Sequence, residues 1–397
     1  MTSTITFLLL IISIFSTRIS FGIPYAVYLS IYILLIILLF RNFSQTNKLR
    51  NQNEYRPINI YFIYIAASIG CGYFIANGYW MWKQFIINQI TLLFILFFYY
   101  FSNPKNVFLF MHKWFLYAII AFVPFSFFMT SDSYGIYLAP ITLLLLCLKY
   151  VSFKSKVILL ILFVIACSDF GARSVLFKFI PAILLGLSHL LNINFSKKLI
   201  KILTVSFFIL PIIFFTLGVT GIYNIFQYQS NSSKNLTQIK VNNKGEQIEE
   251  NLLADTRTFI YRDVLSSSVE NNSILFGNTP AKSVFIEGFD NEITNLTGRK
   301  NECGIANLYV WCGLIGVILM SFIYIQASNL AINHSKNYTL QLLGLYIAYR
   351  WIIFWIEDIQ DPTIDNITLY MMIAIAYSRD FRYLSDKHIK LFISKLL

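Results

Sequence analysis

The stretch Ile31-Tyr-Ile-Leu-Leu-Ile-Ile-Leu-Leu-Phe40 contains only hydrophobic residues, with no alternation of apolar and polar positions. Such a run suits a helix that crosses a bilayer, because a helix satisfies its own backbone hydrogen bonds in lipid. A strand of a membrane β-barrel would alternate apolar and polar residues. The whole chain of 397 residues has the same character, since 57% is hydrophobic and only 13% is charged. The sequence therefore predicts an all-α integral membrane protein.

Apolar segments of this kind recur along the chain and predict about twelve transmembrane helices. The first segment lacks a basic amino-terminal region and a small-residue cleavage site, so we expect it to be retained as a span. The first, seventh and last segments are short, which leaves eleven and thirteen spans as alternatives. The spans are expected near residues 4–17, 22–40, 58–76, 84–101, 107–128, 134–150, 157–168, 175–193, 202–220, 305–327, 339–356 and 366–377.

The basic residues predict the orientation of the chain in the membrane, because cytoplasmic loops are enriched in lysine and arginine. With the amino terminus inside, the inner loops and the carboxyl-terminal tail hold 17 such residues, whereas the short outer loops hold only Arg18, Lys83 and Arg173. We therefore expect both termini in the cytoplasm and the protein in the cytoplasmic membrane. The net charge of +12 follows mainly from this topology and gives no reason to expect nucleic acid as a partner.

One long polar segment divides the chain into three parts. Residues 1–220 hold nine predicted spans, residues 221–304 form the polar segment, and residues 305–397 hold three spans and a cytoplasmic tail. The predicted orientation places the polar segment outside the cytoplasm, as one large periplasmic or extracellular loop. Short turns are enough to join membrane helices, so a loop of this size indicates a function at one membrane face.

The large loop contains a polar part and a helical part. Residues 229–251 are poor in apolar side chains and are predicted to be mobile. Asp255 is a good N-cap for a short helix from Thr256 to about Ser268. The apolar stripe expected to bury this helix comprises Phe259, Ile260, Val264 and Leu265.

The sequence contains no pattern that calls for a metal ion or a cofactor, and none is expected. A Walker loop, a dinucleotide fingerprint and a His-Glu-x-x-His helix are all missing from it. The five cysteines lack metal-binding spacing, and four of them lie in or beside predicted spans. The nine spans before the loop and the three after it do not form matching halves, as an inverted-repeat transporter would require.

Arg257 is the strongest candidate for an anion contact in the loop. It stands in the first turn of the predicted helix, where unpaired backbone N–H groups and the helix dipole favour an anion. Arg262 lies five residues later, about 140° around the helix axis, so the two arginines cannot easily hold one ligand. We expect Arg262 to pair with Asp263 or to face solvent. An ordinary loop arginine is the alternative for Arg257.

Two further cations lie at or within the eighth predicted span. Arg173 stands at the outer start of this span, where its guanidinium can reach a phosphate at the headgroup level. A pair with Asp169 or a contact with lipid phosphates is the alternative. Lys178 lies deeper in the same span, where a cation usually faces a polar cavity or a partner.

Arg350 lies in the middle of the eleventh predicted span. It is either part of a structural ion pair or part of the same polar cavity as Lys178. The outer turn after this span is acidic and is interpreted as a solvated turn. Its carboxylates are Glu357, Asp358, Asp361 and Asp365.

Four segments together resemble motifs of the O-antigen polymerase and ligase superfamily, a group of bacterial envelope glycosyltransferases. Gly171-Ala-Arg-Ser174 resembles the family's Ser-Arg-Gly or Ser-Arg-Thr turn. Arg257 followed by Tyr261 resembles its Arg-x-x-x-Trp loop helix. Leu275-Phe-Gly277 resembles its Leu-x-Gly-x-Gly turn, with Thr279 in place of the second glycine.

The fourth segment resembles the start of the family's span after the loop. Glu302 through Leu308 matches the beginning of that span, and Gly313-Leu-Ile-Gly316 matches its Gly-Leu-x-Gly end. The four motifs fall between residues 169 and 319, and the rest of the chain matches only in topology. Glu302 stands where ligases typically carry histidine, which favours the polymerase branch.

The resemblance implies a metal-independent glycosyl transfer between undecaprenyl-diphosphate-linked glycans at the outer leaflet. A growing chain on one lipid carrier would move onto the terminal sugar of a newly flipped repeat unit on another. Arg173 and Arg257 would stabilise the diphosphate leaving group, and Glu302 would accept the proton of the attacking hydroxyl. The remaining candidate substrate-binding residues are Lys178, Tyr261 and Arg350. Membrane lipids, a chain-length regulator and a flippase are candidate partners.

Two other functions compete with the polymerase. A ligase would transfer finished polymer to lipid A core or protein, and its loss would leave carrier-linked chains to accumulate. A polysaccharide or lipid-carrier flippase is expected to show related halves and charges spread through many spans. In this chain the polar residues gather around one loop, which favours an enzyme over a transporter.

Overall fold

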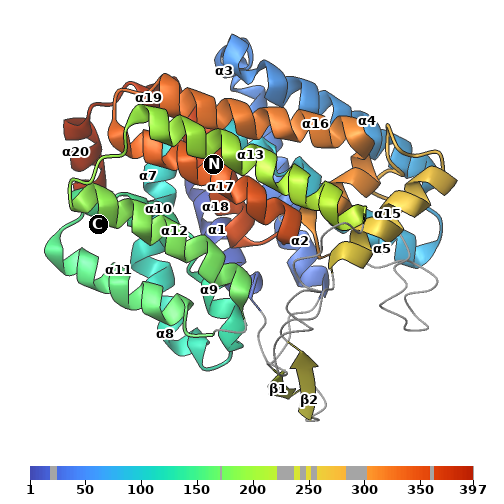
Figure 1. Ribbon diagram of the computed structural model, residues 1–397, viewed down its shortest axis with the longest axis horizontal. Coiled ribbons are helices and arrows are strands. Elements are labelled where there is room, and N and C mark those ends of the chain that lie inside the picture. Colours follow the sequence, from blue (N-terminus) through green and yellow to red (C-terminus); the bar gives the residue numbers. More distant parts are fainter. Residues whose placement is uncertain are drawn as a thin grey trace.

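The computed structural model describes residues 1–17, 25–169, 172–220, 237–241, 247–251, 257–282, 302–357 and 362–396. These residues are largely helical (Figure 1). Among them, eight helical segments are long and apolar enough to cross a membrane, and α1 and α18 are shorter apolar helices. The prediction of a helical, polytopic membrane protein is confirmed at this level, while the count of twelve spans stays a prediction.

The amino-terminal half of the chain is helical in its described residues. Its first elements are α1 (Thr2–Phe15), α2 (Tyr25–Ser44), α3 (Asn47–Arg50), η1 (Asn53–Tyr55), α4 (Arg56–Ile75), α5 (Gly78–Leu93) and α6 (Leu96–Phe101). They are followed by α7 (Pro104–Lys113), the π-helical turn η2 (Trp114–Ala118), α8 (Ile119–Ser126), η3 (Ser131–Ser133), α9 (Tyr134–Tyr137), α10 (Ile141–Leu146), η4 (Leu148–Tyr150) and α11 (Phe153–Ala166).

The carboxyl-terminal half has longer helices. These are α12 (Arg173–Leu190), α13 (Lys197–Val219), α15 (Arg257–Glu270), α16 (Gly304–Asn333), α17 (Tyr338–Ile356), α18 (Ile364–Tyr377), α19 (Arg379–Arg382) and α20 (Asp386–Leu396). Many helices begin at a side chain that accepts a hydrogen bond from a backbone N–H two or three residues later, as N-caps do. The capping residues are Asn103, Ser152, Ser196, Asn337 and Thr363.

The predicted span over residues 134–150 is not one continuous helix. This segment is divided into α9, α10 and η4, with a turn between α9 and α10 that ends at Pro140. Proline has no backbone N–H to donate to the preceding turn, so it ends the first helix. Apolar composition alone therefore marked the segment as buried but could not show that it is broken.

The all-α prediction has one exception, in the polar part of the loop. Strands β1 (Thr237–Val241) and β2 (Gln247–Asn251) pair antiparallel, with Thr237 opposite Asn251. Both lie within residues 229–251, where the structure thus describes a regular strand pair at ten positions, and the rest of that stretch is outside the described residues. The mobility of the stretch stays a prediction. The pattern Thr237-Gln-Ile-Lys-Val241 alternates in the manner of a strand, and this signal could have been read.

Helix α17 occupies a central position. It packs against α12, α13, α16 and α18, with its most extensive contact along α16. A Cβ atom on Gly344 would lie only 2.9 Å from the Ala331 Cβ atom, so the absence of a side chain there lets α16 and α17 approach closely. Helix α17 is therefore the place where four neighbouring helices meet.

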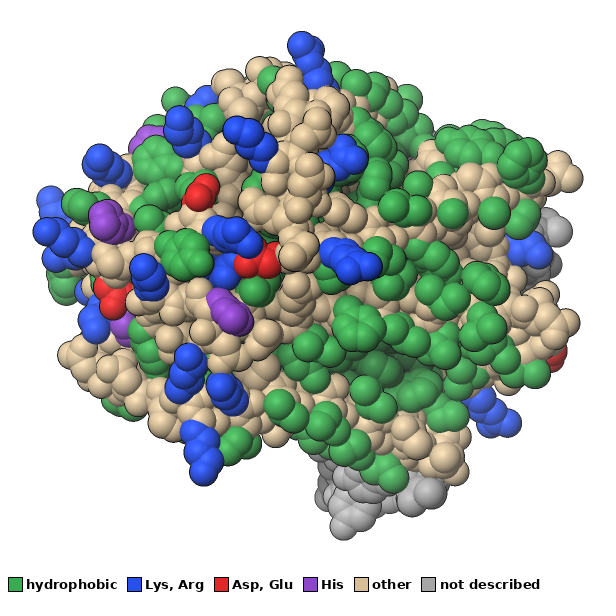
Figure 2. Space-filling view, turned by 90° about the horizontal axis from the view of Figure 1, so that it is seen from above, with side chains coloured by type: hydrophobic (Ala, Val, Ile, Leu, Met, Phe, Trp, Pro, Cys, Tyr) green, Lys and Arg blue, Asp and Glu red, His purple; other side chains and the backbone are tan. Residues whose placement is uncertain are grey.

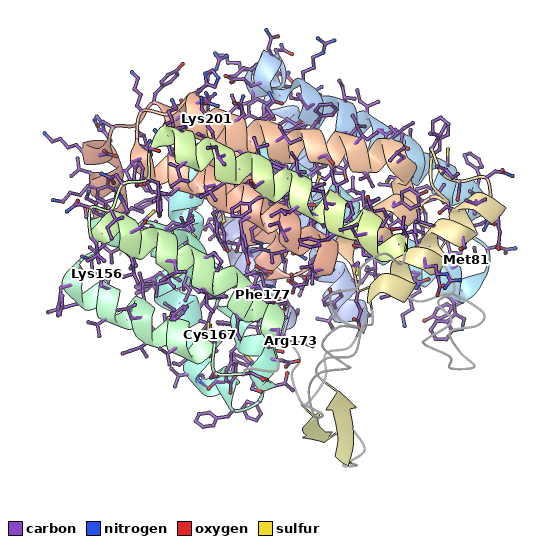
Figure 3. The ribbon with its side chains drawn as sticks, in the orientation of Figure 1. Met81, Lys156, Cys167, Arg173, Phe177 and Lys201 are labelled. Atoms are coloured by element: carbon purple, nitrogen blue, oxygen red, sulfur yellow. The ribbon has the colours of Figure 1, made fainter. Side chains whose placement is uncertain are left out.

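The two ends of the bundle differ in charge. Lysine and arginine side chains gather at one end, while much of the adjoining surface is hydrophobic (Figure 2). Lys156 and Lys201 lie at this end, which we call the basic end, and Arg173 and Met81 lie away from it (Figure 3). This clustering of basic side chains at one end agrees with the unequal numbers of lysines and arginines in the predicted inner and outer loops. Which end faces the cytoplasm stays a prediction.

Candidate functional site

Helix α16 is interrupted near its start, at Gly313. The backbone of Gly313 has φ 61° and ψ −167°, outside the helical region. Such a break leaves backbone N–H and C=O groups without partners inside the helix. The loop after α15 supplies the missing hydrogen-bond partners. The N–H of Asn278 donates to the carbonyl of Val310 at 2.6 Å. The N–H groups of Leu314 and Ile315 donate to the carbonyls of Ile274 at 2.9 Å and Leu275 at 3.2 Å.

Helix α4 completes the hydrogen bonding of the break. The Ser68 hydroxyl donates to the carbonyl of Trp311 at 3.1 Å, and the Tyr64 hydroxyl donates to the carbonyl of Cys312 at 2.6 Å. Unpaired buried carbonyls would destabilise the fold, so these two side chains stabilise the interrupted helix. The break is therefore supported from two sides, by the loop and by α4.

Two glycines make the close approach of the loop possible. Gly277 and Gly313 both have positive φ angles, of 75° and 61°. A Cβ atom on Gly277 would lie 2.5 Å from Gly313 N, and one on Gly313 would lie 2.3 Å from the carbonyl oxygen of Leu275. Any side chain would clash at either position. The segments Leu275–Gly277 and Gly313–Gly316, which the sequence singled out separately, are thus in direct contact.

A buried cluster of charges connects α12, α17 and α18. Lys178 Nζ lies 2.8 Å from Glu357 Oε1 and 2.9 Å from Asp365 Oδ2. The two terminal nitrogens of Arg350 each lie 3.3 Å from an oxygen of Asp365. Lys178, Arg350 and Asp365 are buried, whereas the side chain of Glu357 is 27% exposed. Two cations and two carboxylates therefore neutralise one another inside the bundle.

This cluster resolves two alternatives that the sequence left open. For Lys178, which could face a cavity or a partner, the structure shows carboxylate partners. For Arg350, which could form an ion pair or line the same cavity, the structure shows an ion pair with Asp365. The interpretation of the acidic turn as merely solvated is wrong for Asp365, which is buried at the start of α18. Two cations within spans require carboxylates nearby, and this requirement was the signal that could have identified Asp365. Asp358 and Asp361 lie outside the described residues.

The start of α16 is held at the end of α17. The backbone N–H of Gly304 donates to the carbonyl oxygen of Glu357 at 3.0 Å. Glu302 lies two residues before Gly304 and is exposed. The candidate base is therefore tied by its own backbone to the residue whose side chain binds Lys178.

Helix α15 runs from Arg257 to Glu270, close to the predicted bounds. Ile260, Val264 and Ser268 are buried, and the helix packs against α13 and α16. Leu265 is only half-buried, so the predicted stripe is partly correct. The side chains of Arg257 and Phe259 are outside the described part of the structure. Arg262 is exposed, which agrees with the solvent-facing alternative.

Tyr261 anchors α15 to the central helix. Its hydroxyl donates to the carbonyl of Trp355, near the end of α17. Its ring lies 5.1 Å from that of Phe215 on α13 and 6.3 Å from that of Trp355, measured between centroids. These contacts give Tyr261 a packing role, and they place the helix that begins at Arg257 against the carboxyl-terminal part of α17.

Arg173 is the first residue of α12 and is exposed (Figure 3). Its helix carries Lys178, so Arg173 is linked to Glu357 through one and a half turns of α12. The contacts described here join the elements that carry Arg173, Arg257 and Glu302. The convergence of these three side chains on one ligand stays a prediction.

Two buried polar atoms near the end of α17 have no hydrogen-bond partner among the described residues. They are Glu357 Oε2 and Trp355 Nε1. Buried polar atoms are normally paired, so they mark a place where a polar ligand or water would be stabilised. In the same described residues, no group of three or more His, Cys, Asp and Glu side chains is arranged to hold a metal ion.

Comparisons of the chain with protein-family models, with curated proteins and with solved structures find no match. The functional interpretation therefore depends on the residues and contacts described above.

Proposed function

We propose that the protein is a glycosyltransferase that polymerises undecaprenyl-diphosphate-linked repeat units at the outer face of the cytoplasmic membrane. The observation that supports this most is the contact between two motif segments distant in the sequence, Leu275–Gly277 and Gly313–Gly316. The other two motifs are carried by α12 and α15, both of which contact α17. The four segments that resemble motifs of one family therefore lie on helices and a loop that are neighbours in the fold.

In the proposed reaction, a hydroxyl oxygen of the acceptor sugar attacks the anomeric carbon of the donor glycan. The bond between that carbon and the diphosphate oxygen breaks, and its electron pair leaves with the diphosphate. Arg173 and Arg257 stabilise the negative charge that develops on the leaving group. Glu302 accepts the proton of the attacking hydroxyl, and its exposure leaves it accessible to a substrate.

The buried charge cluster supports a positioning role for Lys178 and Arg350. Both side chains are already bound to carboxylates, so neither is free to leave its partners without cost. Lys178 holds the side chain of Glu357, whose carbonyl holds the start of α16 and therefore Glu302. Tyr261 positions α15 in the same way, through Trp355. These three residues are therefore proposed to act through the groups that they hold.

We also propose that the membrane part has twelve spans, with both termini in the cytoplasm. Eight helical segments and two shorter apolar helices account for ten of them. Helix α11 and the broken segment from α9 to η4 are proposed as the other two. The large loop is proposed to lie outside, on the side of Arg173, where lipid-linked repeat units are polymerised.

Gene replacement in bacteria tests this function. In a host that lacks its own polymerase and makes the matching repeat unit, the gene should restore long glycan chains, visible as a ladder on a gel. In a host that lacks only its ligase, the gene should not restore the transfer of polymer to lipid A core or protein, and carrier-linked chains should still accumulate. The reverse outcome would identify a ligase, and restoration of neither phenotype would remove the support for an enzyme of this superfamily.

A further inference from the structure

The last helix, α20, is a docked amphipathic helix at the basic end of the molecule. It buries Ile389, Ile393 and Leu396, while Lys387, Lys390 and Lys395 are exposed. Its contacts are with α7 and η4. His112 Nδ1 lies 2.7 Å from the carbonyl oxygen of Leu396, and the rings of Phe108 and Phe392 pack edge to face at 5.5 Å. The apolar side of α20 is thus covered by the protein, and its exposed lysines are left at the surface, where cations of an amphipathic helix can meet lipid headgroups.

An open groove of about 520 Å³ lies between α7 and α20. Its floor is apolar and its rim is cationic. The floor is formed by Phe108, Leu109, Leu391 and Phe392, and the rim carries Lys105 and Lys395. Both lysines are exposed, and among the described residues no carboxylate lines the groove. Leu391 is 50% exposed, so part of the floor is left uncovered by the protein.

The apolar surface continues along the same span beyond the groove. In η2 and α8, Leu116, Tyr117, Ile120 and Val123 are 46% to 65% exposed. An acyl chain that begins in the groove can therefore continue along exposed apolar side chains. A soluble anion would gain nothing from this surface, and a neutral lipid would gain nothing from the two lysines.

We propose that the groove between α7 and α20 is a binding site for an anionic membrane phospholipid. The phosphate lies between Lys105 and Lys395, and the acyl chains cover Leu391 and the neighbouring floor. Each lysine near a lipid phosphate contributes about 1 kcal/mol, which is roughly a fivefold change in affinity. The site is separate from the residues proposed for catalysis, and its occupation fixes α20 against the bundle.

Lipid retention by the purified full-length protein tests this proposal. Native mass spectrometry in mixed micelles compares phosphatidylglycerol with phosphatidylcholine of the same acyl chains. The wild type should retain phosphatidylglycerol preferentially. The pair Lys105→Gln and Lys395→Gln should weaken this binding roughly 25-fold. Leu391→Ser should also weaken it, because the floor loses apolar contact.

A matched pair of exposed lysines provides the control. Lys154 on α11 and Lys201 on α13 are also exposed, and Lys201 lies at the basic end (Figure 3). Replacing both by glutamine should leave lipid retention unchanged. Equal loss in this control would show a diffuse attraction and overturn the site. Equal retention of the two lipids, or full displacement by soluble glycerol phosphate, would overturn it as well.

Discussion

Lys178 Nζ lies 2.9 Å from Asp365 Oδ2 inside the helix bundle, and the same carboxylate binds Arg350. One buried side chain thus connects α12, α17 and α18. A buried carboxylate is stable only when its charge is matched, and here Lys178 and Arg350 balance the charges of Asp365 and the neighbouring Glu357. Asp365 is the carboxylate that binds both buried cations, so the packing of these three helices depends on it.

Asp365→Asn should destabilise the protein strongly. It leaves two buried cations with Glu357 as their remaining carboxylate, and breaking a buried pair costs about 3–5 kcal/mol. Thermal unfolding of the purified protein in detergent measures the effect. Asp380→Asn, at an exposed carboxylate of α19, is the control and should change little. Equal unfolding temperatures for Asp365→Asn and wild type would show that the cluster does not stabilise the fold.

Alanine at Gly277 or Gly313 should separate the loop from the broken helix. Each Cβ would clash with backbone atoms, and each residue has a positive φ, so the cost should exceed about 2 kcal/mol. Gly70→Ala is the matched control, because a Cβ there meets nothing within 4 Å. Unfolding and protease sensitivity of the loop should change for the first two variants only. A similar response of all three would contradict the role assigned to the contact.

Two arginines that share one carboxylate allow a comparison of buried and exposed pairing. Glu54 binds Arg382 at 2.8 Å and Arg379 at 2.9 Å, and their side chains are 2% and 50% exposed. The hydrogen bond to Glu54 raises the pKa of Arg379 above its usual range, so that guanidinium stays charged in any assay. Arg382→Met should lower the free energy of unfolding by about 3 kcal/mol, and Arg379→Met by less than about 1 kcal/mol. Equal losses in denaturation experiments would show that burial does not decide the effect.

The helices could be predicted well from the sequence, because the length of an apolar segment is a local property of the chain. Most predicted spans coincide with observed helical segments, and the bounds of α15 followed from a local stripe and polar ends. The break at Gly313 could not be predicted, since it is satisfied by Asn278, Ile274 and Leu275 from a distant loop. The pairing of Asp365 is equally non-local. The helix break at Gly313 and the pairing of Asp365 depend on contacts between segments distant in the sequence, which local composition does not show.

Tyr261→Phe should loosen α15 without unfolding the bundle. The substitution removes the hydrogen bond to the Trp355 carbonyl but keeps the ring that packs on Phe215. The partly buried carbonyl loses its donor, which costs about 1 kcal/mol. Glycan chain length in cells should decrease while the amount of protein in the membrane stays constant. Tyr79→Phe, at a tyrosine 70% exposed, should have no effect. If both variants behave alike, Tyr261 does not position the helix.

Chain extension by the purified protein tests the proposed activity most directly. The purified protein is supplied with an undecaprenyl-diphosphate-linked repeat unit in the presence of a metal chelator. A ladder of products should form, with one undecaprenyl diphosphate released for each linkage. Arg173→Ala and Arg257→Ala should reduce the rate at least about 100-fold, as expected for groups that stabilise a leaving anion, whereas Arg262→Ala should not. Unchanged product length and amount with Arg173→Ala or Arg257→Ala would contradict the proposed mechanism.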